Sequence, residues 1–244
     1  LFTSCGFYPL AETQSVLMLE NRKNGLERFY SAFLPEFPEN HGNTLTGGVG
    51  CIVMNCNPFT KGHLALITYA ASRCSLLHIF VVEEDRSLFP FEVRMRLVKE
   101  GTAHLPNVKV HPSGPYMISS ATFPTYFLKK GEDAARIQSE LDITLFASRI
   151  APLFHITKRF AGEEPLDPVT RDYNEAMIRL LPQYSISFIK IARTTAETPE
   201  GKPEVISASR VRKLLVETGV TEEVLQLVPP CTAQYLKNEF GARP

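Results

Sequence analysis

The chain has 244 residues, of which 44% are hydrophobic and 21% are charged. This composition is typical of a globular protein with a sizeable core. Its 26 basic and 26 acidic side chains cancel, so no net charge attracts it to nucleic acid or to an anionic membrane. The longest apolar runs, such as residues 76–82, are too short to span a bilayer. We therefore expect neither nucleic acid nor a membrane as a partner.

Five cysteines occur without a C-x-x-C spacing, and their number is odd. This usage is typical of reduced thiols in a cytosolic protein, and no signal peptide is visible, so a cytoplasmic location is expected. No cluster of metal ligands is evident, and no metal site is predicted.

The first 34 residues predict a strand pair at 6–10 and 15–20, followed by a short helix at 26–33. They are too few for an independent core, so residues 1–34 are interpreted as the end of a larger domain or as a lid. Residues 35–48 are rich in Pro, Gly and Asn, which favours a linker. The main domain is predicted to run from 49 to 244.

The stretch that organises this domain is a strand followed by a helix. Residues 49–54 are apolar and partly β-branched, which favours a buried strand, and helical periodicity begins at Leu64. Thr60, Gly62 and His63 therefore lie at a helix N-terminus, where unpaired N–H groups suit a phosphate. Gly62 leaves room for a ligand, and Thr60 and His63 offer donors. A plain strand–turn–helix with a capping threonine explains the motif equally well.

A second strand is predicted at residues 76–82 and a helix at 91–104. Arg94 falls in the middle of the apolar stripe of that helix. A buried guanidinium is costly unless it is paired. The residue is therefore interpreted either as part of a structural ion pair, as a snorkelling side chain, or as an arginine directed into a phosphate site.

The middle of the chain continues the alternation of strands and helices. Residues 112–124 form a polar and aromatic loop after a predicted strand, a position where α/β proteins bind ligands, although a simple crossover loop is an equal alternative. The other predicted elements are strands at 108–111, 144–147 and 156–159 and helices at 125–130 and 132–141.

The next turn contains Gly162 and the adjacent acids Glu163 and Glu164. These acids are either a solvated turn or ligands for a ribose hydroxyl or a basic partner. Pro168 is favoured at the first position of a helix, and Pro182 ends that helix. A strand at 187–193 and a polar loop at 194–203 follow.

A second candidate site opens a late helix, with Ser207 as its N-cap and Gly219 at its end. Arg210, Arg212 and Ser209 crowd its first turn. Cations at the positive end of a helix are unfavourable unless an anion is present. A structural cap needs only Ser207, so the arginines favour a phosphate site. We expect both helix N-termini to converge on one triphosphate.

Together the two motifs resemble those of the nucleotidylyltransferase superfamily, which has (H/T)xGH and ISxSxxR patterns in this order. The resemblance implies an α/β fold with a Rossmann-like parallel sheet and helices on both faces, which the alternation of strands and helices also favours. It further implies that Thr60 and His63 stabilise charge at the α-phosphate and the departing pyrophosphate. Arg212 would hold the β- and γ-phosphates, and Arg94 matches the basic residue after the second strand.

A closer resemblance, to the citrate lyase ligase family, spans nearly the whole chain. Its most discriminating segments are ISSATFPTYFLK at 118–129 and GEEP-x-x-P-V-T-x-x-Y-N at 162–174. It also extends over GCIVMNCNPFTKGH, LHIFVVEEDRSLFPFEVRMRLVKEG and ISASRVRKLL. Family members have an N-terminal acetyltransferase-like domain, of which residues 1–34 resemble only the end.

The family resemblance implies that acetate and ATP form acetyl-AMP and pyrophosphate. The acetyl group then passes to the thiol of the phosphoribosyl-dephospho-CoA group on the acyl-carrier subunit of citrate lyase. Acetate is the nucleophile, so catalysis needs only positioning and neutralisation of phosphate charge. Mg²⁺ is expected to arrive with ATP.

The residues implied fall into three groups. The catalytic residues are Thr60, His63 and Arg212. The ATP-binding residues are Asn57, Phe59, Gly62, Arg94, Gly162, Glu163, Ser207 and Ser209. The acetate site is placed in the loop, at Ser119, Ser120, Phe123 and Tyr126.

Three alternatives stay open at this point. The first is an adenylyltransferase for another small substrate, such as phosphopantetheine or nicotinamide mononucleotide. The second is a nucleotide-binding or carrier-binding module without chemistry. The third is a structural α/β domain, which leaves Arg94, Arg210 and Arg212 without an explanation.

Overall fold

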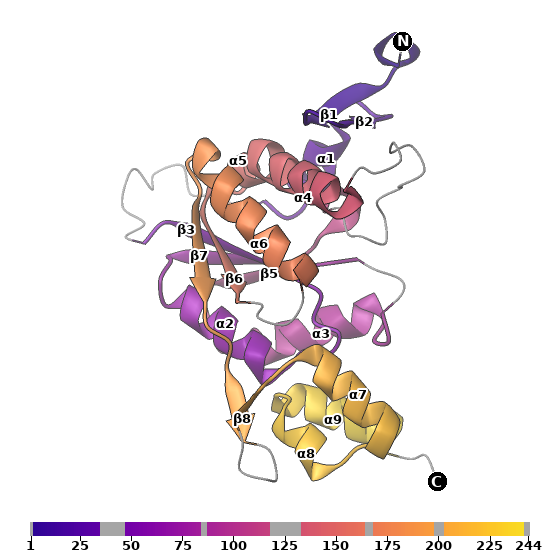
Figure 1. Ribbon diagram of the computed structural model, residues 1–244, viewed down its shortest axis with the longest axis vertical. Helices are drawn as coiled ribbons and strands as arrows, with labels where there is room; N and C mark the ends of the chain where they lie inside the picture. The colour runs from indigo at the N-terminus through magenta and orange to yellow at the C-terminus, as the bar shows by residue number, and fades with distance from the viewer. Residues whose placement is uncertain are drawn as a thin grey trace.

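A parallel sheet forms the centre of the molecule (Figure 1). The computed structural model describes residues 2–34, 47–83, 87–117, 133–163, 168–197 and 203–241. Within these residues the sheet has five strands in the order β5-β4-β3-β6-β7, all parallel. Their bounds are Val49–Met54 (β3), Leu76–Val81 (β4), Val108–Pro112 (β5), Ile156–Gly162 (β6) and Ser187–Ile191 (β7).

The central strands β3 and β4 are apolar along almost their whole length and are covered on both faces, as is usual for parallel strands. The chain passes from β3 to β4 and β5 on one side and then returns to β6 and β7 on the other. The strand order therefore reverses between β3 and β6, and open parallel sheets bind ligands at such a point.

Helices cover both faces of the sheet (Figure 1), so the predicted fold class is confirmed. Helices α2 (Lys61–Ala71) and α3 (Phe91–Thr102) lie on one face. The other face carries α1 (Gly25–Ser31), α4 (Ala134–Leu145), α5 (Ala151–Leu153) and α6 (Pro168–Leu180). Short helical turns occur at Thr3–Cys5, Gly114–Tyr116, Phe146–Ile150 and Leu181–Tyr184.

The strand predicted at 144–147 is wrong. Helix α4 continues to Leu145, and a π-helical turn follows at Phe146–Ile150. Ile143, Leu145, Phe146 and Ala147 are all buried. A short run that is buried on every side has no period that distinguishes a strand from a helix.

The N-terminal residues share the main core. Strands β1 (Tyr8–Glu12) and β2 (Leu17–Glu20) pair as predicted. Leu26 and Tyr30 of α1 are fully buried, and the Tyr30 hydroxyl donates to the Ser113 carbonyl at 2.7 Å. The described part of this segment therefore packs on the sheet rather than around a core of its own. Most of the predicted linker lies outside the described residues.

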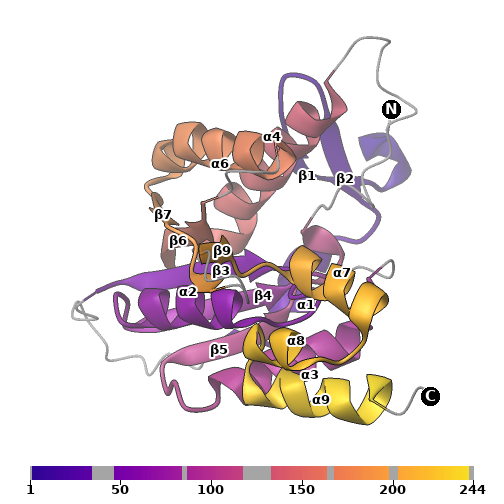
Figure 2. The same cartoon turned by 60° about the horizontal axis from the view of Figure 1, so that its bottom comes forward.

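The C-terminal residues form a small helical unit beside α3 (Figure 2). It contains α7 (Ala208–Thr218), α8 (Glu222–Gln226) and α9 (Pro230–Phe240). Phe89 is buried in its apolar cluster. The polar loop predicted at 194–203 instead contains a short antiparallel pair, β8 (Thr195–Glu197) and β9 (Pro203–Val205). Among the helices of the described ranges, none has the length and apolar character needed to cross a bilayer.

Candidate active site

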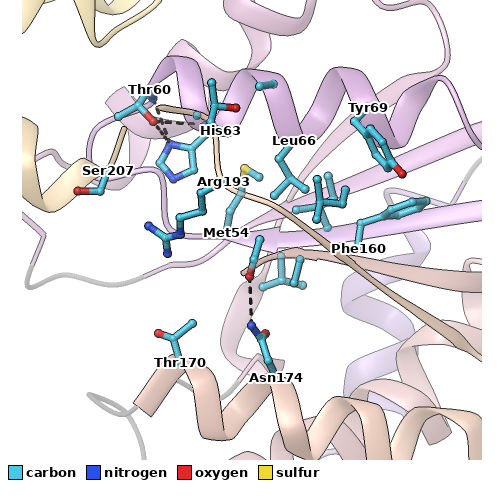
Figure 3. Close-up of a pocket in the computed structure, with 18 of the residues that line it drawn as sticks. Met54, Thr60, His63, Leu66, Tyr69, Phe160, Thr170, Asn174, Arg193 and Ser207 are labelled. Carbon is cyan, nitrogen blue, oxygen red and sulfur yellow. Dashed lines mark hydrogen bonds between the residues drawn. The ribbon is translucent and has the colours of Figure 1, made fainter. Parts of the chain in front are cut away.

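A cavity of about 630 Å³ lies where β3 and β6 end, between α2 and α6 (Figure 3). Side chains from both faces of the sheet and from the start of α7 line it. Its polar and charged lining residues are Asn55, Thr60, His63, Tyr69, Arg159, Thr170, Tyr173, Asn174, Arg193, Thr194 and Ser207. The cavity therefore occupies the reversal point of the strand order.

Thr60 and His63 form a reciprocal cap at the start of α2 (Figure 3). The Thr60 hydroxyl oxygen accepts from the His63 backbone N–H at 3.3 Å. The Thr60 backbone N–H donates to His63 Nδ1 at 3.1 Å. Because Nδ1 accepts, the neutral ring has its proton on Nε2. Thr60 is almost fully buried, and these two bonds orient the imidazole.

His63 is neutral near physiological pH. Burial lowers its pKa, with a smaller contribution from the positive charge of Arg193, to about 4. Both residues line the cavity and lie close together in Figure 3. His63 therefore provides an uncharged Nε2–H donor to the cavity, and Arg193 provides the positive charge beside it.

The two helix N-termini touch, as Gly62 shows. A Cβ atom on Gly62 would lie 2.8 Å from the Ile206 carbonyl oxygen. The absence of a side chain thus allows the close approach of α7, in addition to leaving room for a ligand. Ser207 caps α7 by accepting from the Arg210 N–H at 3.1 Å and also lines the cavity.

Asn57 and Phe59 support this region from outside the cavity lining. The Asn57 carbonyl accepts from Arg212 Nη1, and its side-chain oxygen accepts from the Phe89 N–H at 3.1 Å. Phe59 is fully buried, and its ring is nearly parallel to that of His63, with centroids 6.1 Å apart. The structure therefore assigns both residues a supporting position rather than direct access to the cavity.

Arg212 bridges the two helix tips without being a lining residue. One guanidinium nitrogen donates to the Asn57 carbonyl and the other to the Ser209 hydroxyl at 3.1 Å. Arg210 is different, because its guanidinium pairs with Glu204 at 3.2 Å and Glu223 at 3.0 Å. The anion expected beside Arg210 is therefore supplied by two carboxylates of the protein.

Arg94 does not reach the cavity lining. Its side chain is fully buried, and Nη1 donates to the carbonyls of Asn55 at 2.7 Å and Val82 at 2.8 Å. Its Nε donates to the Phe89 carbonyl at 3.0 Å. These hydrogen bonds offset the desolvation free energy of the buried guanidinium and connect the segments that follow β3 and β4. The arrangement supports the structural interpretation of Arg94.

Gly162 lies in the cavity lining, and its carbonyl accepts from the Asn174 side-chain amide at 3.1 Å. Glu163 is exposed and is not a lining residue; its backbone N–H donates to the Ile191 carbonyl at 2.8 Å. The predicted acetate-site residues are Ser119, Ser120, Phe123 and Tyr126, all of which lie outside the described residues.

Several lining residues were missed by the sequence interpretation: Arg159, Thr170, Asn174 and Arg193. A signal existed for the two arginines. Arg193 follows the carboxyl end of β7, and Arg159 is a charged residue next to the apolar Phe160 and Ala161 in β6. Thr170 and Asn174 project from α6 towards the cavity (Figure 3), and their signal was the family segment at 162–174, in which both are fixed positions.

Comparison with known proteins identifies the family. A profile described as "Citrate lyase ligase C-terminal domain" matches residues 49–236. The chain is 42% identical over 239 residues to the citrate (pro-3S)-lyase ligase of Escherichia coli K12, covering 98% of this chain and 66% of the relative. The Klebsiella pneumoniae protein of the same name is 40% identical over 241 residues, with coverage of 97% and 67%. The chain thus spans about two thirds of the length of these relatives.

Among solved structures, a bifunctional NMN adenylyltransferase/ADP ribose pyrophosphatase from Francisella tularensis is similar, with a TM-score of 0.50. It is 14% identical to this chain, and the match covers 78% of this chain and 49% of that one. At this identity the match establishes a shared fold.

Proposed function

This chain belongs to the citrate lyase ligase family, a family of enzymes, and from that premise we propose that it is an ATP-dependent ligase that activates acetate as acetyl-AMP. It then transfers the acetyl group to the thiol of the phosphoribosyl-dephospho-CoA group on the acyl-carrier subunit of citrate lyase. AMP and pyrophosphate are the other products.

The single observation that supports ATP chemistry at this site is the meeting of two helix N-termini at one cavity. Gly62 of α2 packs against Ile206, next to the cap of α7, and Ser207 and His63 line the same cavity. Each helix start has N–H groups without helical partners and a partial positive charge. Two such ends side by side suit a polyphosphate.

The first chemical step is attack of an acetate oxygen on the α-phosphorus of ATP. A bond forms between that oxygen and phosphorus, and the bond from phosphorus to the bridging oxygen breaks, so that pyrophosphate leaves with its electron pair. The Nε2–H of His63 and the charge of Arg193 stabilise the negative charge on the phosphate oxygens. In the second step the thiol loses its proton to water and its sulfur bonds to the acetyl carbon, while the bond from that carbon to the phosphate oxygen breaks and AMP leaves with the electron pair.

The protein needs no nucleophile of its own for these steps. Burial raises the pKa of the Cys51 thiol to about 11, and Cys56 and Cys74 are also buried with raised pKa values. The described lining residues include no carboxylate, and the described residues hold no group of three His, Cys, Asp or Glu placed for a metal. Mg²⁺, which supplies charge neutralisation, fits here when held by phosphate oxygens and water.

Acetate-dependent exchange of labelled pyrophosphate into ATP tests this function. We expect exchange to require acetate and to ignore phosphopantetheine and nicotinamide mononucleotide. Exchange driven by either of those compounds indicates an adenylyltransferase for another substrate. ATP binding without any exchange indicates a binding module, and either result rejects the proposal.

A further inference from the structure

Arg159 is a buried charge at the edge of the cavity. It belongs to β6 and pairs in register with Cys51 of β3. Only 4% of the residue is exposed, yet it lines the cavity. A guanidinium in such a position is costly unless an anion or several hydrogen-bond acceptors compensate it.

The contacts of Arg159 compensate little of this cost. Its Nη1 lies 4.0 Å from the Cys51 sulfur, a weak acceptor, and its guanidinium carbon lies 4.3 Å from the centroid of the Phe146 ring. Arg159 takes part in none of the ion pairs formed between described residues. Arg159 therefore retains hydrogen-bonding capacity for a ligand.

Asp142 is a buried acid that accepts a hydrogen bond from Tyr173, a residue of the cavity lining. The Tyr173 hydroxyl donates to Asp142 Oδ2 at 2.5 Å. Burial and then the Asp142 charge raise the pKa of Tyr173, whereas Arg159 opposes that shift. Asp142 and Arg159 thus both act on Tyr173, and the hydrogen bond that Asp142 is seen to accept comes from the tyrosine hydroxyl.

The surroundings of Arg159 fit a small acid. Phe146, Met177 and the partly buried Val53 belong to the core cluster on the α4 and α6 face, and Met177 and Val53 also line the cavity. The His63 helix packs into the cluster on the opposite face. The phosphate-binding helix tips and Arg159 therefore enter the cavity from different faces, as a site for two substrates requires.

We propose that Arg159 binds the carboxylate of the acid substrate, with Met177 and Val53 next to its alkyl part. One carboxylate oxygen accepts from the guanidinium, and the other is directed at the α-phosphorus. The inference rests on the proposed function, since it names the subsite of the acid in the same reaction. It gives the acid a charged anchor within the described residues.

Arg159→Gln tests the assignment in the exchange assay. We expect the KM for acetate to rise about 10- to 100-fold, as for the loss of a hydrogen bond to a charged group, with the KM for ATP nearly unchanged. Lys158→Gln is the matched control, because it removes a charge from the adjacent strand position, where the amine contacts the Gly47 and Arg73 carbonyls outside the cavity. An unchanged KM for acetate in Arg159→Gln, or an equal rise for ATP, overturns the assignment.

Two further measurements cover the other outcomes. If Arg159→Gln does not fold, Arg159→Lys replaces it as the test, because its ammonium group retains the charge but lacks the planar arrangement of donors. We expect the KM for acetate of Arg159→Lys to rise while its KM for ATP stays unchanged. Any other pattern rejects the assignment. If the unmodified chain shows no pyrophosphate exchange with any acid, that result rejects the proposed function and leaves the binding role of Arg159 to a separate measurement. Saturation-transfer NMR of acetate with a non-hydrolysable ATP analogue then tests Arg159 directly, and equal acetate signals in the unmodified and Arg159→Gln chains reject it.

Discussion

At the scale of single residues, His63 illustrates how a local cap sets a chemical role. Its Nδ1 accepts from the Thr60 N–H, so the neutral ring can only donate through Nε2. The low pKa keeps the ring neutral over the physiological range. His63 is thus suited to hydrogen bonding to phosphate oxygens rather than to proton transfer near neutral pH.

We predict that His63→Ala lowers kcat by about 10²–10³-fold, as for the loss of one charge-stabilising donor. Because the folded pKa is about 4, the ring stays in its neutral form and the contribution of His63 should stay constant as pH falls from about 8 to about 5. Steady-state exchange rates across this range measure both effects. His104→Ala, at an exposed position, is the control. Near-normal turnover in His63→Ala would remove this residue from the mechanism.

At the scale of elements, two arginines near the start of helix α7 make different contacts within the protein. Arg210 joins α7 to Glu204 of β9 and Glu223 of α8. Arg212 reaches the loop before α2 through the Asn57 carbonyl. The same helix therefore stabilises the C-terminal unit on one side and aligns the cavity on the other.

Arg210→Met and Arg212→Met should consequently behave differently. Arg210→Met leaves Glu223 and Glu204 without their partner, so we expect a lower Tm and a KM for ATP within about threefold of normal. Arg212→Met should reduce kcat/KM for ATP roughly 10- to 100-fold, because the tips of α2 and α7 lose their bridge. Thermal unfolding and exchange kinetics on both variants provide the comparison. A reversed pattern contradicts this expectation.

At the scale of the whole molecule, a buried histidine pair links the sheet to its N-terminal cover. His78 Nδ1 and His111 Nε2 lie 2.8 Å apart on β4 and β5. Phe80 and Phe154 pack on both rings, and Phe33, just after α1, packs on His111. Burial, together with nearby positive charge, lowers the pKa of His78 to about 3 and that of His111 to about 4.

Stability should therefore fall on acidification before most carboxylates titrate. The unfolded chain binds protons at these histidines below about pH 6.5, whereas the folded chain does so only near 3 to 4. Their contribution is complete above about pH 6.5 and declines by about 1.4 kcal/mol per pH unit for each histidine below it. Urea unfolding between about pH 7 and pH 5 measures this slope. The double variant His78→Gln/His111→Gln should flatten it, and an equal slope would contradict the prediction.

The alternation of strands and helices, the two helix caps and the family could all be predicted from the sequence. These features are local: an apolar run of five or six residues predicts a strand, and Thr60 and Ser207 predict the helix starts. The buried run at 144–147 was the exception, since burial on every side removed the period.

Which arginines line the cavity depends on contacts between distant parts of the chain. Sequence interpretation favoured Arg94 and Arg212, whereas the fold places Arg159 and Arg193 in the lining and surrounds Arg94 with backbone carbonyls. The physical reason is that the energy of a buried charge depends on its partners. Those partners, such as Asn55 for Arg94, come from distant parts of the chain. Local periodicity predicts that a side chain is buried, but the residues that contact it are known only from the folded structure.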